Sequence, residues 1–170
     1  MFMPIFSHKF SGLFRPKPKP APIIIEDALG RFTLEKGDSC SGEVSLLGRE
    51  ITVYLETDGD GKTTADNSLE ALRAFAANAA KWDADIKQFA ADEFADENGM
   101  IETWGSSEDD SEGDVISKEE FTRRISMNFI QFYRDGSLFL DYDLDELFTD
   151  HGLGVHAHIS GRIESCALWG

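Results

Sequence analysis

The chain has 170 residues, a length that suits one folded domain with a hydrophobic core of its own. Its composition is ordinary for a globular protein, but its formal net charge of −16 is not. Such a charge disfavours binding to nucleic acid and to anionic membranes, whereas it favours basic partners or cations. Solubility alone is the competing explanation for the acidic composition.

The two cysteines, Cys40 and Cys166, have neither C-x-x-C nor zinc-finger spacing. So few thiols suggest a reducing compartment. Because the sequence shows neither a secretory signal nor an apolar stretch long enough to span a membrane, we expect a cytoplasmic protein.

Residues 1–22 differ from the rest of the chain. They contain four basic residues and no acid, which leaves 12 basic and 32 acidic residues, a net −20, for residues 23–170. Phenylalanine recurs at every fourth position of this segment, as Phe2, Phe6, Phe10 and Phe14. In a helix these rings could contact a membrane surface or a partner's groove, but Pro4, Gly12 and the PKPKP run favour a flexible tail. We therefore assign 1–22 as a tail and 23–170 as a single domain.

Alternation of apolar and polar residues predicts strands over residues 31–37, 43–48 and 49–56. From Leu69 to Phe89 the apolar spacing changes to three and four residues, which predicts an amphipathic helix extending to about residue 96. We expect a break near Trp82–Asp83, and an N-cap at Asn67 with Glu70 three residues later.

An acidic insert at 105–114, which has five acids and no base, should form a solvated loop without fixed structure. Beyond it, Ser117 and Glu120 form a capping box for a short helix. Asp135-Gly136 between two apolar runs is typical of a β-hairpin, and two more strands are expected at 154–160 and 162–169. This order predicts an α+β fold: a largely antiparallel sheet of about six to seven strands, packed against a long helix or helix pair plus one short helix.

The segment ETDGDGKTTADN at residues 56–67 partly matches an EF-hand calcium loop. Glu56, Asp58 and Asp60 stand at the first, third and fifth positions. However, a strand pattern leads into the loop, and Asn67 replaces the bidentate glutamate at its twelfth position. A turn between a strand and a helix is the simpler interpretation.

A second cluster combines His156 and His158, which alternate on one expected strand, with Asp141 and Asp143, which alternate on another. If the two strands are neighbours and share a face, these side chains could bind zinc, manganese or iron. The alternative is that these polar side chains simply face solvent on a half-buried sheet.

The C-terminal third contains, in order, an acid-rich turn with Leu147-Phe148, then His151, a strand, Gly161 and a final Ala167-x-x-Gly170. This succession resembles a bacterial family known as a domain of unknown function. The family pattern reads roughly F-W-G-H-S-I, then a strand and an A-x-L-x-G ending. Phe148, His151, Gly161, Ala167 and Gly170 match it, although Thr149-Asp150 replaces Trp-Gly, and the resemblance extends over about 28–170. The resemblance implies a small cytoplasmic α+β protein. By analogy with related small acidic proteins, it suggests an immunity or interaction factor, and it transfers no catalytic residue to this chain.

The hypothesis that best fits these observations is a non-enzymatic acidic interaction domain, of immunity type in one version, that binds a basic protein. The surface we assign to it comprises Glu108, Asp109, Asp110, Glu112, Asp145, Glu146 and Asp150. A metal-dependent enzyme that uses the His/Asp cluster, and a membrane-surface adaptor that uses the tail, are the alternatives. No cofactor is implied apart from the divalent metal of the enzyme hypothesis.

Overall fold

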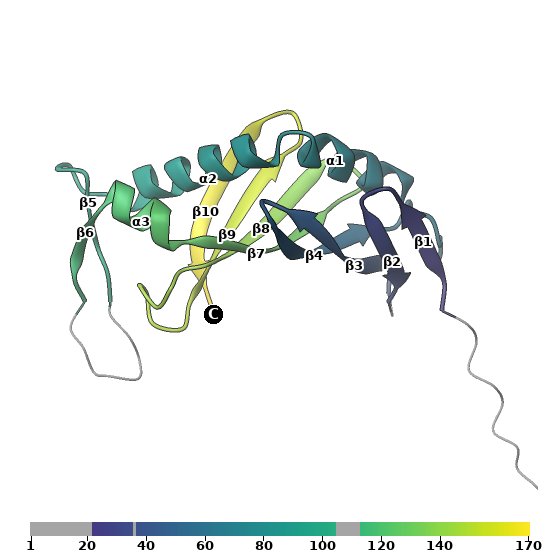
Figure 1. Cartoon of the computed structure of the whole chain (residues 1–170), viewed down its shortest axis with the longest axis horizontal. Helices are drawn as coiled ribbons and strands as arrows, with labels where there is room; N and C mark the ends of the chain where they lie inside the picture. The colour runs from purple at the N-terminus through teal and green to yellow at the C-terminus, as the bar shows by residue number, and fades with distance from the viewer. Residues whose placement is uncertain (1–21, 36, 105–112) are drawn as a thin grey trace, which may run out of the picture.

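The main sheet of this α+β protein consists of two antiparallel meanders joined by one parallel pair of strands (Figure 1). The computed structural model describes residues 22–35, 37–104 and 113–170. Eight strands follow the order β1-β2-β3-β4-β7-β8-β9-β10. Only β4 and β7 run parallel, and all other neighbours in this sheet are antiparallel.

The first meander contains β1 (Ile24–Asp27), β2 (Gly30–Leu34), β3 (Ser39–Leu46) and β4 (Arg49–Glu56). The second contains β7 (Ser126–Phe132), β8 (Ser137–Asp143), β9 (Gly152–His158) and β10 (Arg162–Trp169). Between them come α1 (Asp66–Ala76), α2 (Ala79–Phe94), β5 (Met100–Glu102), β6 (Val115–Ser117) and α3 (Lys118–Arg124). β5 and β6 pair as a separate two-stranded ribbon.

The fold class is confirmed, but the sheet is larger than the six to seven strands expected. The additional strand is β1, a short edge strand that pairs with β2. The hairpin prediction holds: the Asp135-Gly136 turn connects β7 to β8, and Gly136 has a φ of 88°, which suits glycine. The structure also contains the unpredicted β5–β6 ribbon, whose strands have only three residues each.

The helices cover one face of the sheet, so a helix pair rather than one long helix packs on the core (Figure 1). The break lies at Ala77–Asn78, several residues before the expected Trp82–Asp83. At α3 the N-cap half of the expected capping box is confirmed, because the Glu120 amide donates to Ser117 Oγ over 3.1 Å, while the Glu120 carboxylate accepts from Arg123. No helix in the described part of the chain is long and apolar enough to cross a membrane.

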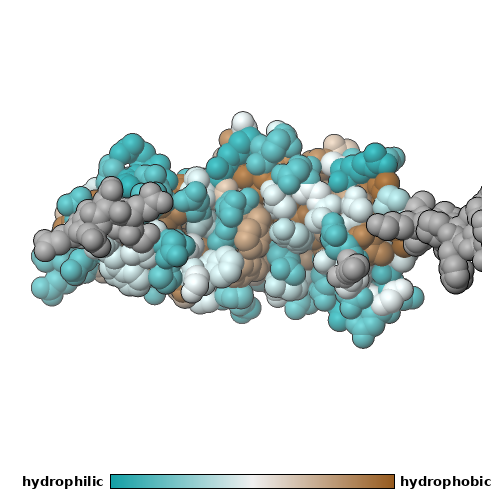
Figure 2. All heavy atoms as spheres, turned by 90° about the horizontal axis from the view of Figure 1, so that it is seen from below, coloured by the Kyte–Doolittle hydropathy of each residue, from teal (hydrophilic) through white to brown (hydrophobic). Residues whose placement is uncertain are grey.

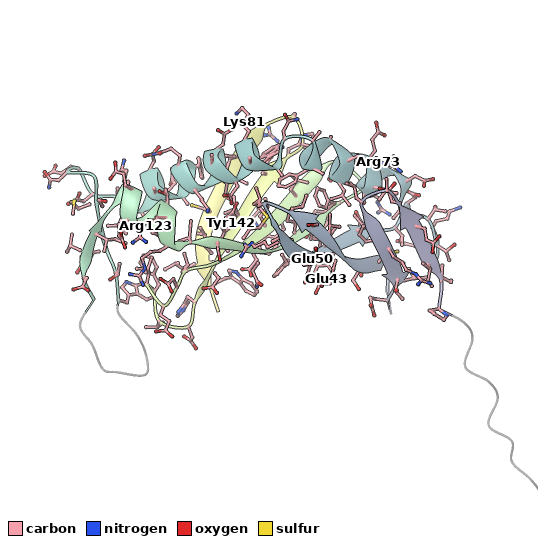
Figure 3. All side chains as sticks on the ribbon, viewed as in Figure 1. Glu43, Glu50, Arg73, Lys81, Arg123 and Tyr142 are labelled. Carbon is pink, nitrogen blue, oxygen red and sulfur yellow. The ribbon has the colours of Figure 1, made fainter. Side chains whose placement is uncertain are left out.

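The hydrophobic core lies between this covered face and the helices. Alternate residues of β4 are buried, namely Ile51, Val53 and Leu55, and they pack with residues such as Phe75 of α1 and Ile86 of α2. Tyr142 of β8 also points to this side, beneath α2 (Figure 3), where its hydroxyl donates to Asp83 over 3.1 Å. No helix of the described residues covers the opposite face of the sheet, which is called the open face below.

The open face carries both acidic and aromatic side chains, and seen from below it mixes hydrophobic patches with hydrophilic borders (Figure 2). Glu43 and Glu50 project from its first meander (Figure 3). Across the parallel β4–β7 pair, the ring of Tyr54 packs edge to face on that of Phe129 at 5.7 Å, and the Phe129 ring lies 5.8 Å from that of Phe139 in β8. An aromatic row therefore crosses this face toward the C-terminal strands.

Candidate functional site

Asp58 of the calcium-like segment caps helix α1. Its carboxylate accepts hydrogen bonds from Thr64 Oγ1 at 2.6 Å and from the backbone amides of Asp66 at 3.0 Å and Asn67 at 3.1 Å. The hydrogen bond from Thr64 and those from the helix amides lower the pKa of Asp58. The expected N-cap at Asn67 is wrong, since α1 begins at Asp66 and the cap comes from a residue eight positions earlier.

The other two acids of that segment do not join Asp58. Glu56 accepts a hydrogen bond from the backbone amide of Arg134 at 2.9 Å and faces its guanidinium, and Asp60 is exposed. Donors already occupy the carboxylate of Asp58, which lies at the positive end of a helix, a position unfavourable for a cation. The segment is arranged as a turn that starts a helix.

For the His/Asp cluster, both conditions are met: β8 and β9 are neighbours, and the four side chains project from the open face. The register, however, separates the two pairs. Asp141 lies opposite Gly154, while His156 lies opposite Phe139 and His158 opposite Ser137. Throughout the described ranges, no three His, Cys, Asp or Glu side chains are grouped to hold a metal ion. The structure therefore does not bring the predicted ligands together.

His158 instead takes part in the turn after β9. The backbone amide of Ser160 donates to His158 Nδ1 at 3.1 Å, which assigns the proton of the neutral ring to Nε2. Nε2 faces the carbonyl oxygen of Asp135 at 3.3 Å, in the turn between β7 and β8. His156 is exposed, and its ring packs 5.1 Å from that of Phe139.

A pocket of about 490 Å³ lies on the open face at the end of β8, next to the loop formed by residues 144–151. We call it the acidic pocket, because four carboxylates line it and none of the described residues in its lining is a lysine or arginine. The remaining lining is polar, aromatic or glycine. The lining residues are Asn128, Phe129, Asp141, Tyr142, Asp143, Glu146, Thr149, Asp150, His151, Gly152, Trp169 and Gly170.

Trp169 of β10 forms one wall of this pocket in a fixed orientation. Its indole Nε1 donates to Asp141 Oδ1 at 2.9 Å, and Asn128 Nδ2 donates to Asp141 Oδ2 at 2.8 Å. Asp141 is only 4% exposed, whereas Trp169 is 48% exposed. A buried carboxylate therefore positions a half-exposed aromatic ring, and Asp141 acts through Trp169 rather than as an open surface charge.

Two glycines of β9 make room for that ring. A Cβ atom at Gly152 would lie 3.0 Å from Asp141 Oδ1 and 3.1 Å from Trp169 Nε1. At Gly154 it would lie 2.9 Å from the Phe139 ring and 3.3 Å from Trp169 Cδ1. Side chains at these positions would displace the indole, so glycine in β9 is part of how the wall is built.

Buried side chains anchor the 144–151 loop, and several of its residues have an unfavourable backbone conformation. Leu144, Leu147 and Phe148 are buried, and Trp104 of the segment after β5 packs edge to face on Phe148 at 5.5 Å. Three non-glycine residues of this loop have left-handed backbone conformations, with φ of 49° to 59°. They are Asp145, Glu146 and Thr149. Because each such residue costs free energy, the anchoring must hold the loop in this shape.

The acids proposed as a partner surface divide into three groups. Glu146 and Asp150 line the acidic pocket. Asp145 does not, because its carboxylate and carbonyl oxygens accept hydrogen bonds from Arg124 at 2.6 and 2.7 Å. Glu108, Asp109, Asp110 and Glu112 lie outside the described residues, as do Phe2, Phe6, Phe10 and Phe14 of the tail.

The structure adds Trp169 and Asn128 to the candidate residues, and the sequence offered little signal for them. Asn128, Asp141 and Trp169 are distant in the chain and meet only through the order β7-β8-β9-β10. His151 matches the family pattern, and its Nδ1 lies 3.2 Å from the Phe148 carbonyl oxygen and 3.0 Å from Thr149 Oγ1. Its contacts are those of a turn residue at the rim of the pocket.

The two cysteines are free and lie in different meanders, Cys40 in β3 and Cys166 in β10. Burial raises the pKa of the Cys40 thiol, and the nearby Glu35 raises it further. Burial, followed by the charge of Glu93, raises the pKa of Cys166 to about 11. Both thiols are therefore protonated and weakly reactive at neutral pH.

Fold and site together define a class: an α+β domain whose helices cover one face of a sheet and whose other face presents a preformed acidic and aromatic pocket. The chain belongs to the family DUF2262, described as an uncharacterized protein conserved in bacteria, whose family model matches residues 26–168. This match confirms the resemblance seen in the C-terminal third. Neither a curated protein nor a solved structure matches the chain.

Proposed function

We propose that this chain is a non-enzymatic interaction domain that binds a basic segment of a partner protein in the acidic pocket. The observation that supports the proposal most directly is the lining itself. Asp143, Glu146 and Asp150 line the same pocket as the half-exposed Trp169, and none of the described lining residues is a lysine or arginine. A lysine or arginine side chain would gain carboxylate contacts and a cation–π contact with the indole, worth roughly 0.5–2 kcal/mol.

The charge of the whole domain supports the same kind of ligand. Residues 23–170 carry a net −20, and Glu43 and Glu50 extend the negative charge over the open face (Figure 3). Such a field attracts cationic segments and accelerates their encounter, while the pocket supplies the short-range contacts. A pocket of about 490 Å³ falls within the usual range for binding sites and exceeds what one basic side chain needs.

The walls of the pocket are held in place by contacts within the chain itself. Asp141 holds the indole, and the anchored loop holds Glu146 and Asp150 at the rim. Preorganised walls reduce the ordering cost of binding. An immunity protein that neutralises a basic toxin is one biological form that this proposal takes.

The test compares two triple variants that change the net charge equally. The first, Asp143→Asn/Glu146→Gln/Asp150→Asn, neutralises the pocket. The control, Asp60→Asn/Glu70→Gln/Glu97→Gln, neutralises three exposed acids that are not in its lining. Binding of a fluorescein-labelled octapeptide of alternating lysine and serine is followed by anisotropy in 0.15 M salt, where the Debye length is about 8 Å.

We expect the pocket triple to weaken binding at least tenfold and the control triple to change it less than twofold. Screening by salt leaves only nearby carboxylates effective, which is why the location of the three charges matters. Equal weakening by both triples would show that the peptide responds to net charge alone, and the proposal would then fail.

A further inference from the structure

A second pocket lies next to the acidic pocket on the open face. Its volume is about 310 Å³, and we call it the apolar pocket. Its lining contains no carboxylate, lysine or arginine. The lining residues are Phe139, Gly154, His156, Ser165, Ala167 and Trp169. The aromatic row of the open face therefore ends in a recess rather than on a flat surface.

Trp169 is shared by the two pockets and separates them. One edge of its indole is held by Asp141 in the acidic pocket, while the ring lies 6.1 Å from Phe139 in the apolar pocket. The two pockets are also adjacent along β9, because Gly152 lines the acidic pocket and Gly154 lines the apolar pocket. Two residues along a strand correspond to about 7 Å.

That spacing matches a peptide in the extended conformation, whose side chains at positions i and i+2 point to the same side about 7 Å apart. The different charges of the two pockets determine which peptide side chain each pocket binds. Carboxylates line only the acidic pocket, so a cation belongs there, and the second pocket offers aromatic and aliphatic contacts. Glycine at 154 sets the depth, since a Cβ atom there would approach the Phe139 ring to 2.9 Å.

We infer that the partner segment is an extended peptide with a lysine or arginine two residues from a bulky apolar side chain, the two side chains lying on either side of Trp169. This inference rests on the proposed function and specifies its ligand. The cation enters the acidic pocket, and the apolar side chain enters the apolar pocket against Phe139 and Ala167. Trp169 contacts both side chains, which makes the pair of residues, rather than charge alone, the recognised feature.

The experiment titrates the full chain with seven-residue peptides, blocked at both ends and otherwise made of glycine and serine. One has lysine at its third position and phenylalanine at its fifth, one keeps only the lysine, and one keeps only the phenylalanine. Calorimetry or Trp fluorescence gives each Kd. We expect the lysine–phenylalanine peptide to bind at least tenfold more tightly than either single-feature peptide, because its phenyl ring becomes partly buried.

A variant of the apolar pocket tests whether the tighter binding of the lysine–phenylalanine peptide arises there. Ala167→Leu fills the apolar pocket from an exposed position, and Ala74→Leu is a matched change at an exposed position of α1. We expect Ala167→Leu to remove the tenfold advantage of the lysine–phenylalanine peptide over the lysine-only peptide, and Ala74→Leu to leave that advantage in place. An advantage that survives Ala167→Leu would overturn the assignment of the apolar pocket.

The outcomes separate this inference from the proposed function. If the lysine-only and lysine–phenylalanine peptides have equal Kd values, the two-pocket inference is overturned while cation binding in the acidic pocket stands. If no peptide with lysine binds, both fail. If the phenylalanine-only peptide binds as tightly as the lysine–phenylalanine peptide, the apolar pocket acts alone and the inference is again overturned.

Discussion

Replacing Asp58 by alanine tests whether the 56–67 segment is a helix cap or a calcium loop. The change removes the acceptor for two backbone amides at the start of α1 and for Thr64 Oγ1. Losing a side-chain cap typically costs about 1–2 kcal/mol of stability. For a chain of 170 residues, this corresponds to a decrease in Tm of about 2–8 °C. Thermal unfolding followed by circular dichroism measures it.

The control is Asp60→Ala, which removes an exposed acid of the same segment and should change stability by less than about 0.5 kcal/mol. Calcium should leave both Tm values unchanged. A specific calcium site at a hundred times its Kd would instead add about 2.7 kcal/mol to the wild-type protein. The capping argument would be refuted if Asp58→Ala melted like the wild type, or if Asp58→Ala and Asp60→Ala both lost stability only in the presence of calcium.

The pH dependence gives a second check on Asp58. Its pKa is lowered in the folded protein, so the ionised carboxylate stabilises the fold at neutral pH. That contribution is complete above the unfolded value of about 3.8 and is lost as pH falls through the lower folded pKa. The stability difference between wild type and Asp58→Ala should therefore shrink in acid, as urea titrations at pH 7 and below pH 3.8 would show.

Three further changes probe the core and its thiol. Gly42→Ala should destabilise by about 1–3 kcal/mol in urea titrations, because the added Cβ would lie 2.4 Å from a carbonyl oxygen of β2. Tyr142→Phe should cost about 1–2 kcal/mol with an unchanged m-value, since it removes the buried hydroxyl that donates to Asp83. Cys166, with a pKa of about 11, should react slowly with iodoacetamide at pH 7.5 and about tenfold faster per pH unit above it. Glu93→Gln should shift that reactivity profile to lower pH, and an unchanged profile would show that this carboxylate has no influence on the thiol.

Local patterns predicted most of the regular structure. The strand expected over residues 162–169 coincides with β10, and the alternation over residues 49–56 coincides with β4. Ser117 and Glu120 marked α3 because the capping-box pattern spans only four residues. In each case the physical cause of the element lies within the element itself.

Features that depend on distant contacts were missed. The cap of α1 comes from Asp58 across a turn, so the nearest plausible side chain, Asn67, was the wrong one. The break at Ala77–Asn78 lies within an alanine-rich run that favours an uninterrupted helix. The candidate site is the extreme case, because Asp141 and Trp169 are 28 residues apart and meet only once the strand order and register are known.

The single parallel seam divides the chain into two units with different folding demands. Neighbouring strands within each meander are joined by connections of at most eight residues, so each meander can form from local contacts, whereas residues 57–125 of the chain separate β4 from β7. Nearly every residue of both pockets belongs to the second meander and its 144–151 loop. A bound peptide would therefore slow amide hydrogen exchange chiefly in β7–β10 and leave the opening of β1–β3 almost unchanged.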